Sequence, residues 1–265
     1  MSSVQIKTKG PIGYLILNRP HVMNALDYDM TLGLKAAALS LKNDKTIKCV
    51  VVMGVGDHFM AGGDISYFKK LADAYAQEGE SAYPKDIFDN VHSTIRNIVS
   101  MDKPVIACIK GAVAGFGLSL MLACDLAIAA EDSVFTAAYC HIGASPDGGM
   151  TYFLPRAVGQ KKAAELILTG DRFSAQQAQS WGMLNRVVSS VEVDSETEKL
   201  ATQLCCGPKY ALRRSKELLN QTFDVSLNEQ LDQEAINFRQ SMLEKDFAEG
   251  VTAFSEKRKA KFGES

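Results

Sequence analysis

The stretch KPVIACIKGAVAGFGLSLMLACDLAIA, residues 103–129, determines the fold that this sequence predicts. A short apolar run, PVIACI, leads into the glycine-rich loop GAVAGFG. The helical segment SLMLACD and a second apolar run, LAIAA, follow. Uninterrupted apolar runs of this length are typical of strands buried on both faces of a sheet. Strands that alternate with helices in this way predict an α/β fold.

The same order of strand, glycine loop and helix start occurs once upstream. The apolar run CVVVMG is followed by the loop HFMAGGD, which ends at Asp64. Nearer the N-terminus, VQIKT and YLILN alternate around a Gly-Pro-Ile-Gly turn, which predicts a β-hairpin. Asp27 is placed to cap the amphipathic helix that follows this hairpin. The polar composition of residues 66–85 predicts a mobile surface segment.

Helical patterns dominate the rest of the chain. IFDNVHSTIRNIVSM predicts a helix before residue 103, and helical periodicity resumes at Gln160, interrupted by the short strand NRVV. The break at Cys206-Gly207-Pro208 predicts a boundary. We therefore expect an α/β core over residues 1–206 and a helical region over residues 207–265.

Composition excludes several classes of protein. Hydrophobic residues make up 46% of the 265 residues and charged residues 23%, with a net charge of −2, as in a soluble globular protein. This charge would not recruit nucleic acid, and no apolar run is long enough for a bilayer. We expect no metal site, because the four histidines show no metal-ligand spacing. The N-terminus lacks the pattern of a signal peptide, so we expect a cytoplasmic protein. We expect buried free thiols at Cys49, Cys108, Cys124, Cys140, Cys205 and Cys206.

The two glycine loops have a chemical interpretation and a structural one. Backbone N–H groups in the first turn of a helix lack partners, so two helix starts that face one point can bind a developing oxyanion. Gly62-Gly63 and Gly115-Phe116-Gly117 are the candidates. On the structural interpretation, these glycines only permit tight turns. GAVAGFG matches neither phosphate-binding fingerprint of nucleotide sites.

Taken together, the segments resemble the crotonase superfamily, which is the enoyl-CoA hydratase/isomerase family. The resemblance rests on FMAGGDI at 59–65, the stretch 103–129 and SPDGGMTYFLPRAVG at 145–159. It extends to NRPHVMNAL, LTGDRFSAQQAQSWGMLNRVV and FSEKRKAKF, and so covers nearly the whole chain in order. It implies a spiral of ββα units, a C-terminal helical region that builds trimers or hexamers, and acyl-CoA substrates without a separate cofactor.

The resemblance also implies roles for individual residues. The backbone N–H groups of Gly63 and Phe116 would form the oxyanion hole for the thioester oxygen. Phe254 and Lys257 would meet the coenzyme A of a neighbouring subunit, although Lys257 also fits a solvated basic tail. The other positions assigned to the substrate or its coenzyme A are Asn24, Ala25, Ala61, Gly62, Asp64, Ile65, Gly115, Ser119 and Tyr139.

Asp147, in SPDGG, is either a turn residue or a catalytic carboxylate. Asp between Pro and Gly is ordinary turn chemistry. The resemblance changes the balance, because hydratases of the family carry two glutamates where this chain has Ser119 and, at about the second position, Tyr139. Hydration needs two cooperating groups, whereas shifting a double bond needs one base. We expect Asp147 to be that base, its pKa raised by burial against Phe116, Tyr139 and Tyr152.

The sequence thus predicts an isomerase that converts a 3-enoyl-CoA to a 2-enoyl-CoA. One alternative is an enoyl-CoA hydratase that uses Asp147 and a bound water. A second is a homologue that binds acyl-CoA or RNA without catalysis. A Ser119–His141 nucleophile is disfavoured because GFGLS lacks the nucleophile-elbow pattern. We expect Trp181 to be a packing residue, and surface or capping roles for Asp125, Glu165 and Asp171.

Overall fold

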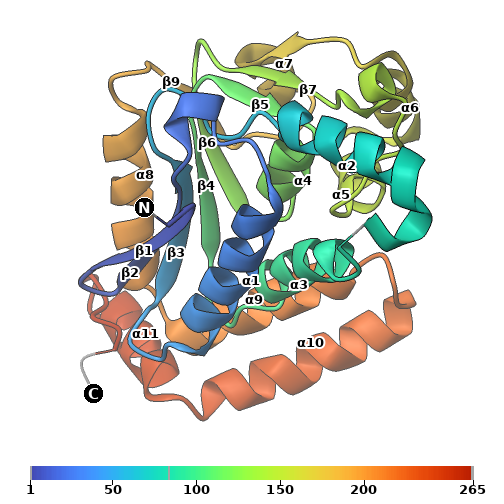
Figure 1. The fold of residues 1–265 in the computed structure, drawn as a ribbon. Helices are drawn as coiled ribbons and strands as arrows, with labels where there is room; N and C mark the ends of the chain where they lie inside the picture. Colours follow the sequence, from blue (N-terminus) through green and yellow to red (C-terminus); the bar gives the residue numbers. More distant parts are fainter. Residues whose placement is uncertain (1, 83, 264–265) are drawn as a thin grey trace.

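The computed structural model describes residues 2–82 and 84–263. Within them, the largest sheet has the strand order β1-β2-β3-β4-β6-β9, with β1 antiparallel to β2 and the following strands parallel (Figure 1). The predicted hairpin and buried strands are confirmed. The strands of this sheet are β1 (Val4–Lys9), β2 (Ile12–Leu17), β3 (Cys49–Gly54), β4 (Val105–Ile109), β6 (Leu126–Ala130) and β9 (Arg186–Val188).

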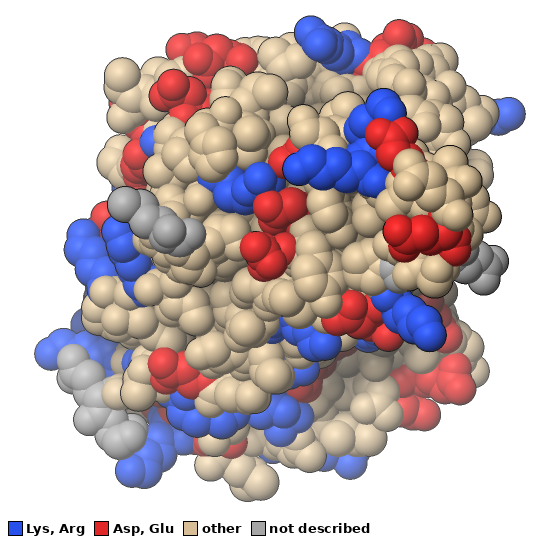
Figure 2. Space-filling view, in the orientation of Figure 1, with Lys and Arg blue, Asp and Glu red and all other residues tan. Residues whose placement is uncertain are grey.

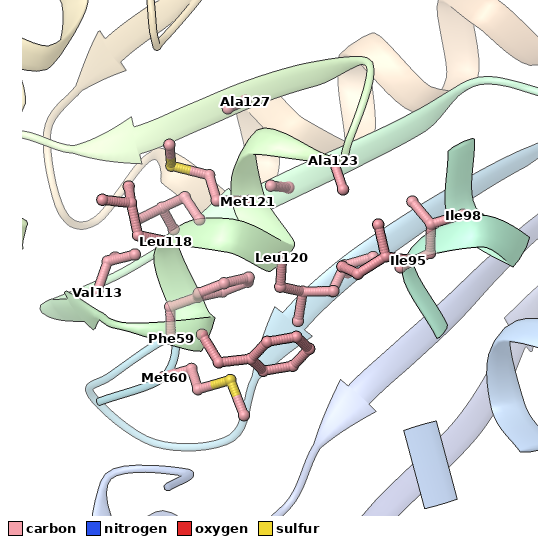
Figure 3. Packing of buried hydrophobic residues seen from close by; sticks show 14 of the residues in the cluster. Phe59, Met60, Ile95, Ile98, Val113, Leu118, Leu120, Met121, Ala123 and Ala127 are labelled. Atoms are coloured by element: carbon pink, nitrogen blue, oxygen red, sulfur yellow. The ribbon is translucent and has the colours of Figure 1, made fainter. Parts of the chain in front are cut away.

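The central strands are apolar without interruption because both faces of the sheet are covered. Successive side chains on a strand point to opposite faces. Val50 and Val52 of β3 join the core beneath α1 (Tyr28–Asn43), α3 (Ile87–Val99) and α4 (Phe116–Leu122), whereas Cys49 and Val51 pack beneath α8 (Val193–Cys205). Figure 3 shows part of the first core, where Phe59 and Met60 pack with Leu118, Leu120 and Ile95.

A smaller sheet lies beside the glycine loops. Its strands are β5 (Ala112–Ala114), β7 (Val134–Thr136) and β8 (Phe173–Ser174). The other helices are α2 (Ile65–Glu78), α5 (Met150–Val158), α6 (Gln160–Thr169), α7 (Ala175–Ser180), α9 (Lys209–Gln221), α10 (Leu227–Met242) and α11 (Lys245–Ser255), with short 3₁₀ turns at Pro20–Val22, Gly79–Ala82 and Tyr139–Ile142. The predicted helical C-terminal region is confirmed. The domain boundary near residue 206 stays a prediction.

Two helix starts are fixed by aspartate caps. Asp27 accepts a hydrogen bond from the N–H of Met30 at the start of α1, as predicted. Asp64 accepts the N–H groups of Ser66 and Tyr67 at the start of α2. Much of the segment over residues 66–85 therefore forms α2, a capped helix whose few apolar residues are spaced along one side. The expected mobility of this segment stays a prediction.

The distribution of surface charge and the burial of the cysteines can also be compared with the sequence predictions. On the face shown in Figure 2, basic and acidic side chains are interspersed. In the described part of the chain, no helix combines the length and apolar character that crossing a bilayer requires. Cys49, Cys108 and Cys205 are buried as expected, but Cys140 and Cys206 are exposed, so the expectation of burial was wrong for these two.

Asp125 fastens the C-terminal helices to the core. Its Oδ2 lies 2.7 Å from Nζ of Lys216 in α9 and accepts the N–H of Val105 at 2.7 Å. The ammonium group also donates to the carbonyls of Ile98 and Lys103, at 3.2 and 3.1 Å. Asp125 is exposed, as expected of a surface or capping residue, but it also holds α9 through Lys216, which lies on a helix that the sequence does not place beside it.

Replacing Lys216 with Ala should destabilise the protein by about 2 kcal/mol, since it removes a buried ammonium group and its hydrogen bonds to Asp125, Ile98 and Lys103. Urea unfolding measures this change. Arg213→Ala, which removes a more exposed i,i+4 pair with Glu217 on the same helix, should cost less than about 1 kcal/mol. Equal effects of the two substitutions would show that the Asp125–Lys216 pair does not hold α9 in place.

Candidate active site

The two glycine loops touch each other. Gly62 and Gly115 have positive φ angles of +85° and +49°. A Cβ on Gly62 would lie 3.1 Å from the carbonyl oxygen of Ala114, and one on Gly115 would lie 3.5 Å from the Cα of Gly62. Backbone hydrogen bonds between Met60 and β5 hold the loops together. Glycine readily adopts the positive φ angle at both positions, and at Gly62 the missing Cβ also permits the close approach to Ala114.

This contact brings two helix starts together. Phe116 is the first residue of α4, and Gly63 directly precedes the cap of α2. Their neighbours are engaged, since Asp64 donates its N–H to the carbonyl of Leu26 and Leu118 donates to Gly115. Within residues 2–82 and 84–263, the N–H groups of Gly63 and Phe116 have no acceptor. They are therefore available to an oxygen placed between the two loops.

Arg19 locks the loop that carries Gly63. Its guanidinium lies 3.0 Å from carboxylate oxygens of both Asp27 and Asp64 and donates to the carbonyl of Ala25. Burial works against ionisation of Asp64, but Arg19 and the capping N–H groups lower its pKa below the usual range. Arg19 thus joins the caps of α1 and α2, a role that the sequence did not indicate.

The other residues that were assigned to the substrate or its coenzyme A differ in their burial and in their contacts. Asn24 is fully buried in a left-handed conformation, and its amide bonds the N–H of Arg19 and the carbonyls of Val55 and His58. It shapes the loop from within. Ala25 is also buried, Ala61 is half-buried, and Ile65 is exposed at the start of α2.

Asp147 is held by the two residues that stand at the predicted glutamate positions. The Tyr139 hydroxyl donates to Oδ1 of Asp147 at 2.5 Å, and the Ser119 hydroxyl donates to the backbone carbonyl of Asp147 at 2.9 Å. Burial raises the pKa of Asp147, while the hydrogen bond from Tyr139 lowers it in part. Burial also raises the pKa of Tyr139, which therefore remains a donor.

The SPDGG turn places Asp147 against α4. Gly148 and Gly149 have positive φ angles of +61° and +82°. A Cβ on Gly148 would lie 2.7 Å from the ring of Phe116, so only glycine lets the turn approach so closely. Tyr152 does not contribute to the burial of Asp147 as expected, because its exposed ring directs its hydroxyl to Asp224.

The structure does not bring every predicted residue to this site. Phe254 is 88% exposed on α11, which lies at the far end of the molecule from α4 (Figure 1). Lys257 follows on the same segment, so both need a neighbouring subunit to reach a site. His141 bonds the carbonyl of Gly170, and Trp181 packs on Phe173 as expected. The described residues contain no cluster of potential metal ligands.

A family model described as enoyl-CoA hydratase/isomerase matches residues 7–265. The chain belongs to this family. It is 33% identical to the crotonyl-CoA hydratase of Syntrophomonas wolfei, over 98% of this chain and 97% of that protein. It is also 33% identical to the 1,2-epoxyphenylacetyl-CoA isomerase of Escherichia coli, over 94% of this chain and 93% of that one.

Solved structures support the same assignment. An enoyl-CoA hydratase from Polaromonas sp. JS666 superposes with a TM-score of 0.90 at 33% identity, covering 98% of this chain and 99% of that one. The predicted crotonase-like α/β fold is therefore confirmed. The relatives of this enoyl-CoA hydratase/isomerase family member include both hydratases and isomerases, so the choice of reaction rests on the residues of its own site.

Asp147→Asn should raise the melting temperature at pH 7 by a few degrees. Because burial raises the pKa of Asp147, the folded state binds this proton more tightly than the unfolded chain. Stability therefore falls as pH rises from the ordinary carboxyl range through the raised pKa. Asn removes this penalty and keeps an acceptor for Tyr139. Thermal unfolding at pH 7 measures the effect, with the exposed Asp171→Asn as an unchanged control. A lower melting temperature for Asp147→Asn would contradict a raised pKa.

Proposed function

We propose that this protein is an enoyl-CoA isomerase that moves the double bond of a 3-enoyl-CoA to the 2-position, with Asp147 as general acid and base. One observation carries the proposal. A half-buried carboxylate is held against the first turn of α4, where the N–H of Phe116 has no acceptor among the described residues, and the predicted glutamate positions are filled by Ser119 and Tyr139.

The reaction follows from this arrangement. The N–H groups of Gly63 and Phe116 both donate hydrogen bonds to the thioester oxygen, and each such donor is worth about 3 kcal/mol of barrier. Asp147 removes a proton from C2, and the electron pair moves through the carbonyl to give a dienolate. The protonated Asp147 then returns the proton to C4, and the double bond forms between C2 and C3. Tyr139 holds Oδ1, which leaves Oδ2 for the proton.

The raised pKa of Asp147 suits this task. A base is most effective when its pKa is close to the working pH. Burial brings the pKa of Asp147 upward from the ordinary carboxyl value, and the hydrogen bond from Tyr139 fixes the direction in which the carboxylate faces. One carboxylate is enough, because the same proton leaves C2 and returns at C4.

The alternative function is hydration of a 2-enoyl-CoA, which the crotonyl-CoA hydratase among the relatives favours. Asp147 would then activate a water and Tyr139 would be its nearest polar partner. We further propose a cytoplasmic trimer or hexamer, joined through the exposed apolar residues of α10 and α11, with coenzyme A present only as part of the substrate. In such an assembly Phe254 and Lys257 would reach a neighbouring subunit's coenzyme A.

Asp147→Asn should lower the rate of isomerisation by about 10³-fold, because an amide cannot take the C2 proton. The measurement is the ultraviolet absorbance of the conjugated 2-enoyl thioester formed from a 3-enoyl-CoA. Asp171→Asn should keep the parent rate. No product from the parent, together with loss of absorbance when a 2-enoyl-CoA is supplied, would refute the isomerase proposal and support hydration.

Tyr139→Phe should move the acidic limb of the pH profile of kcat/KM to higher pH. The Tyr139 hydroxyl lowers the pKa of Asp147, so its removal raises that pKa and the active carboxylate is lost at a higher pH. Steady-state kinetics between pH 4 and pH 9 test this, with His92 as the other titratable group that acts on Asp147. Tyr152→Phe serves as the matched control because Tyr152 bonds Asp224 instead. An unshifted acidic limb in Tyr139→Phe would mean that Asp147 is not the titrating base.

A further inference from the structure

A small apolar cavity adjoins Asp147. It has a volume of about 150 Å³ and lies between α2, α3 and the loop before α1. Phe88 forms its outer wall and is more than half exposed. The apolar side chains that line the cavity are Leu26, Phe68, Leu71, Ile87, Phe88 and Val91.

The cavity presents one carboxylate without a cation. Asp27 is the other acidic residue in its wall, but its oxygens are engaged by the N–H of Met30 and by Arg19. Within residues 2–82 and 84–263, Asp147 forms no ion pair and receives the Tyr139 hydroxyl on one oxygen only. A ligand in this cavity therefore meets mainly hydrocarbon surface, and Asp147 is the carboxylate in its wall with an oxygen that has no partner among the described residues.

Two residues of the cavity wall adjoin Gly63, the proposed oxyanion donor. Leu26 pairs with Gly63 through the backbone, and a Cβ on Gly63 would lie 2.2 Å from the ring of Phe68. Both Leu26 and Phe68 line the cavity. If the thioester oxygen of an acyl group binds the N–H of Gly63, the reacting carbons of that group lie beside Asp147. The far end of the acyl group then enters this cavity.

The volume and the lining indicate the size of that far end. Dry cavities of about 150 Å³ lined by Leu, Ile and Phe hold a molecule the size of benzene. Aromatic walls favour the flat face or edge of a ring. We propose that the acyl group ends in a single six-membered hydrocarbon ring, phenyl or cyclohexyl, carried directly beyond the reacting carbons. This inference rests on the proposed isomerase function.

The test compares three 3-enoyl thioesters: but-3-enoyl-CoA, 4-phenylbut-3-enoyl-CoA and dodec-3-enoyl-CoA. Chromatographic separation of the 3-enoyl and 2-enoyl isomers, started from either isomer, gives the rate of approach to equilibrium and from it kcat/KM, whether or not the proton that Asp147 carries exchanges with solvent. The phenyl substrate should exceed both others by about tenfold or more. An open groove would instead bury more of a longer chain and favour the dodecenoyl substrate, which would overturn the inference.

A cavity-filling variant tests the location of the ring. Leu71→Trp should lower the ratio of kcat/KM for the phenyl substrate to that for but-3-enoyl-CoA by about tenfold. Leu168→Trp, at a 75% exposed position on α6, should leave the ratio as it is in the parent. An unchanged ratio in Leu71→Trp would place the ring elsewhere and overturn the inference.

The two proposals fail in different ways. Isomerisation of but-3-enoyl-CoA without any preference for the phenyl substrate would overturn the ring inference and leave the isomerase proposal standing. If none of the three substrates isomerises, the isomerase proposal fails, and the ring inference that rests on it falls too.

Discussion

The contact between Gly62 and Gly115 is the constraint on which the rest of the site depends. β3 and β4 are parallel neighbours, so the chain leaves both at the same edge of the sheet. The loops can approach because glycine adopts the positive φ angles at both positions and because Gly62 has no Cβ, which would lie only 3.1 Å from the carbonyl oxygen of Ala114. That approach brings the N–H groups of Gly63 and Phe116 to one place. Without it, each helix would start at a separate point, and one oxygen could not accept both N–H groups.

Turn chemistry and catalysis are complementary in SPDGG. The positive φ angles of Gly148 and Gly149 make the turn, and the missing Cβ of Gly148 lets it rest on the Phe116 ring. Ser119, one turn along α4, then bonds the carbonyl of Asp147. In the proposed reaction, the same helix therefore supplies the oxyanion donor Phe116 and fixes the backbone of Asp147. This shared support relates the two groups through a rigid element, as a reaction on adjacent carbons requires.

The sequence was informative where one local rule decided the structure. Buried strands, the Asp27 cap and the glycine loops all follow from patterns a few residues long. It misled where the deciding partner lay far along the chain or where the signal was weak. Lys216 lies 91 residues from Asp125, so no local pattern reveals that pair. The sequence did not predict α2 as a helix because this segment is mostly polar, and the spacing of Phe68 and Leu71 was its main helical signal. Asn24 matched the family, but its role inside the loop became visible only from its three hydrogen bonds.

The environments of two carboxylates separate their roles. Asp64 and Asp147 both border the helix starts, and burial disfavours the ionised form of each. Asp64 is opposed by the guanidinium of Arg19 and by two capping N–H groups, so its pKa falls and it remains a structural anion. Asp147 has one hydroxyl donor and no ion-pair partner among the described residues, so its pKa rises. A carboxylate that is stabilised in the way Asp64 is has too little affinity for a proton to remove one from carbon. The less stabilised Asp147 is therefore the one suited to proton transfer. The same burial that makes its ionised form unfavourable also makes it a stronger base.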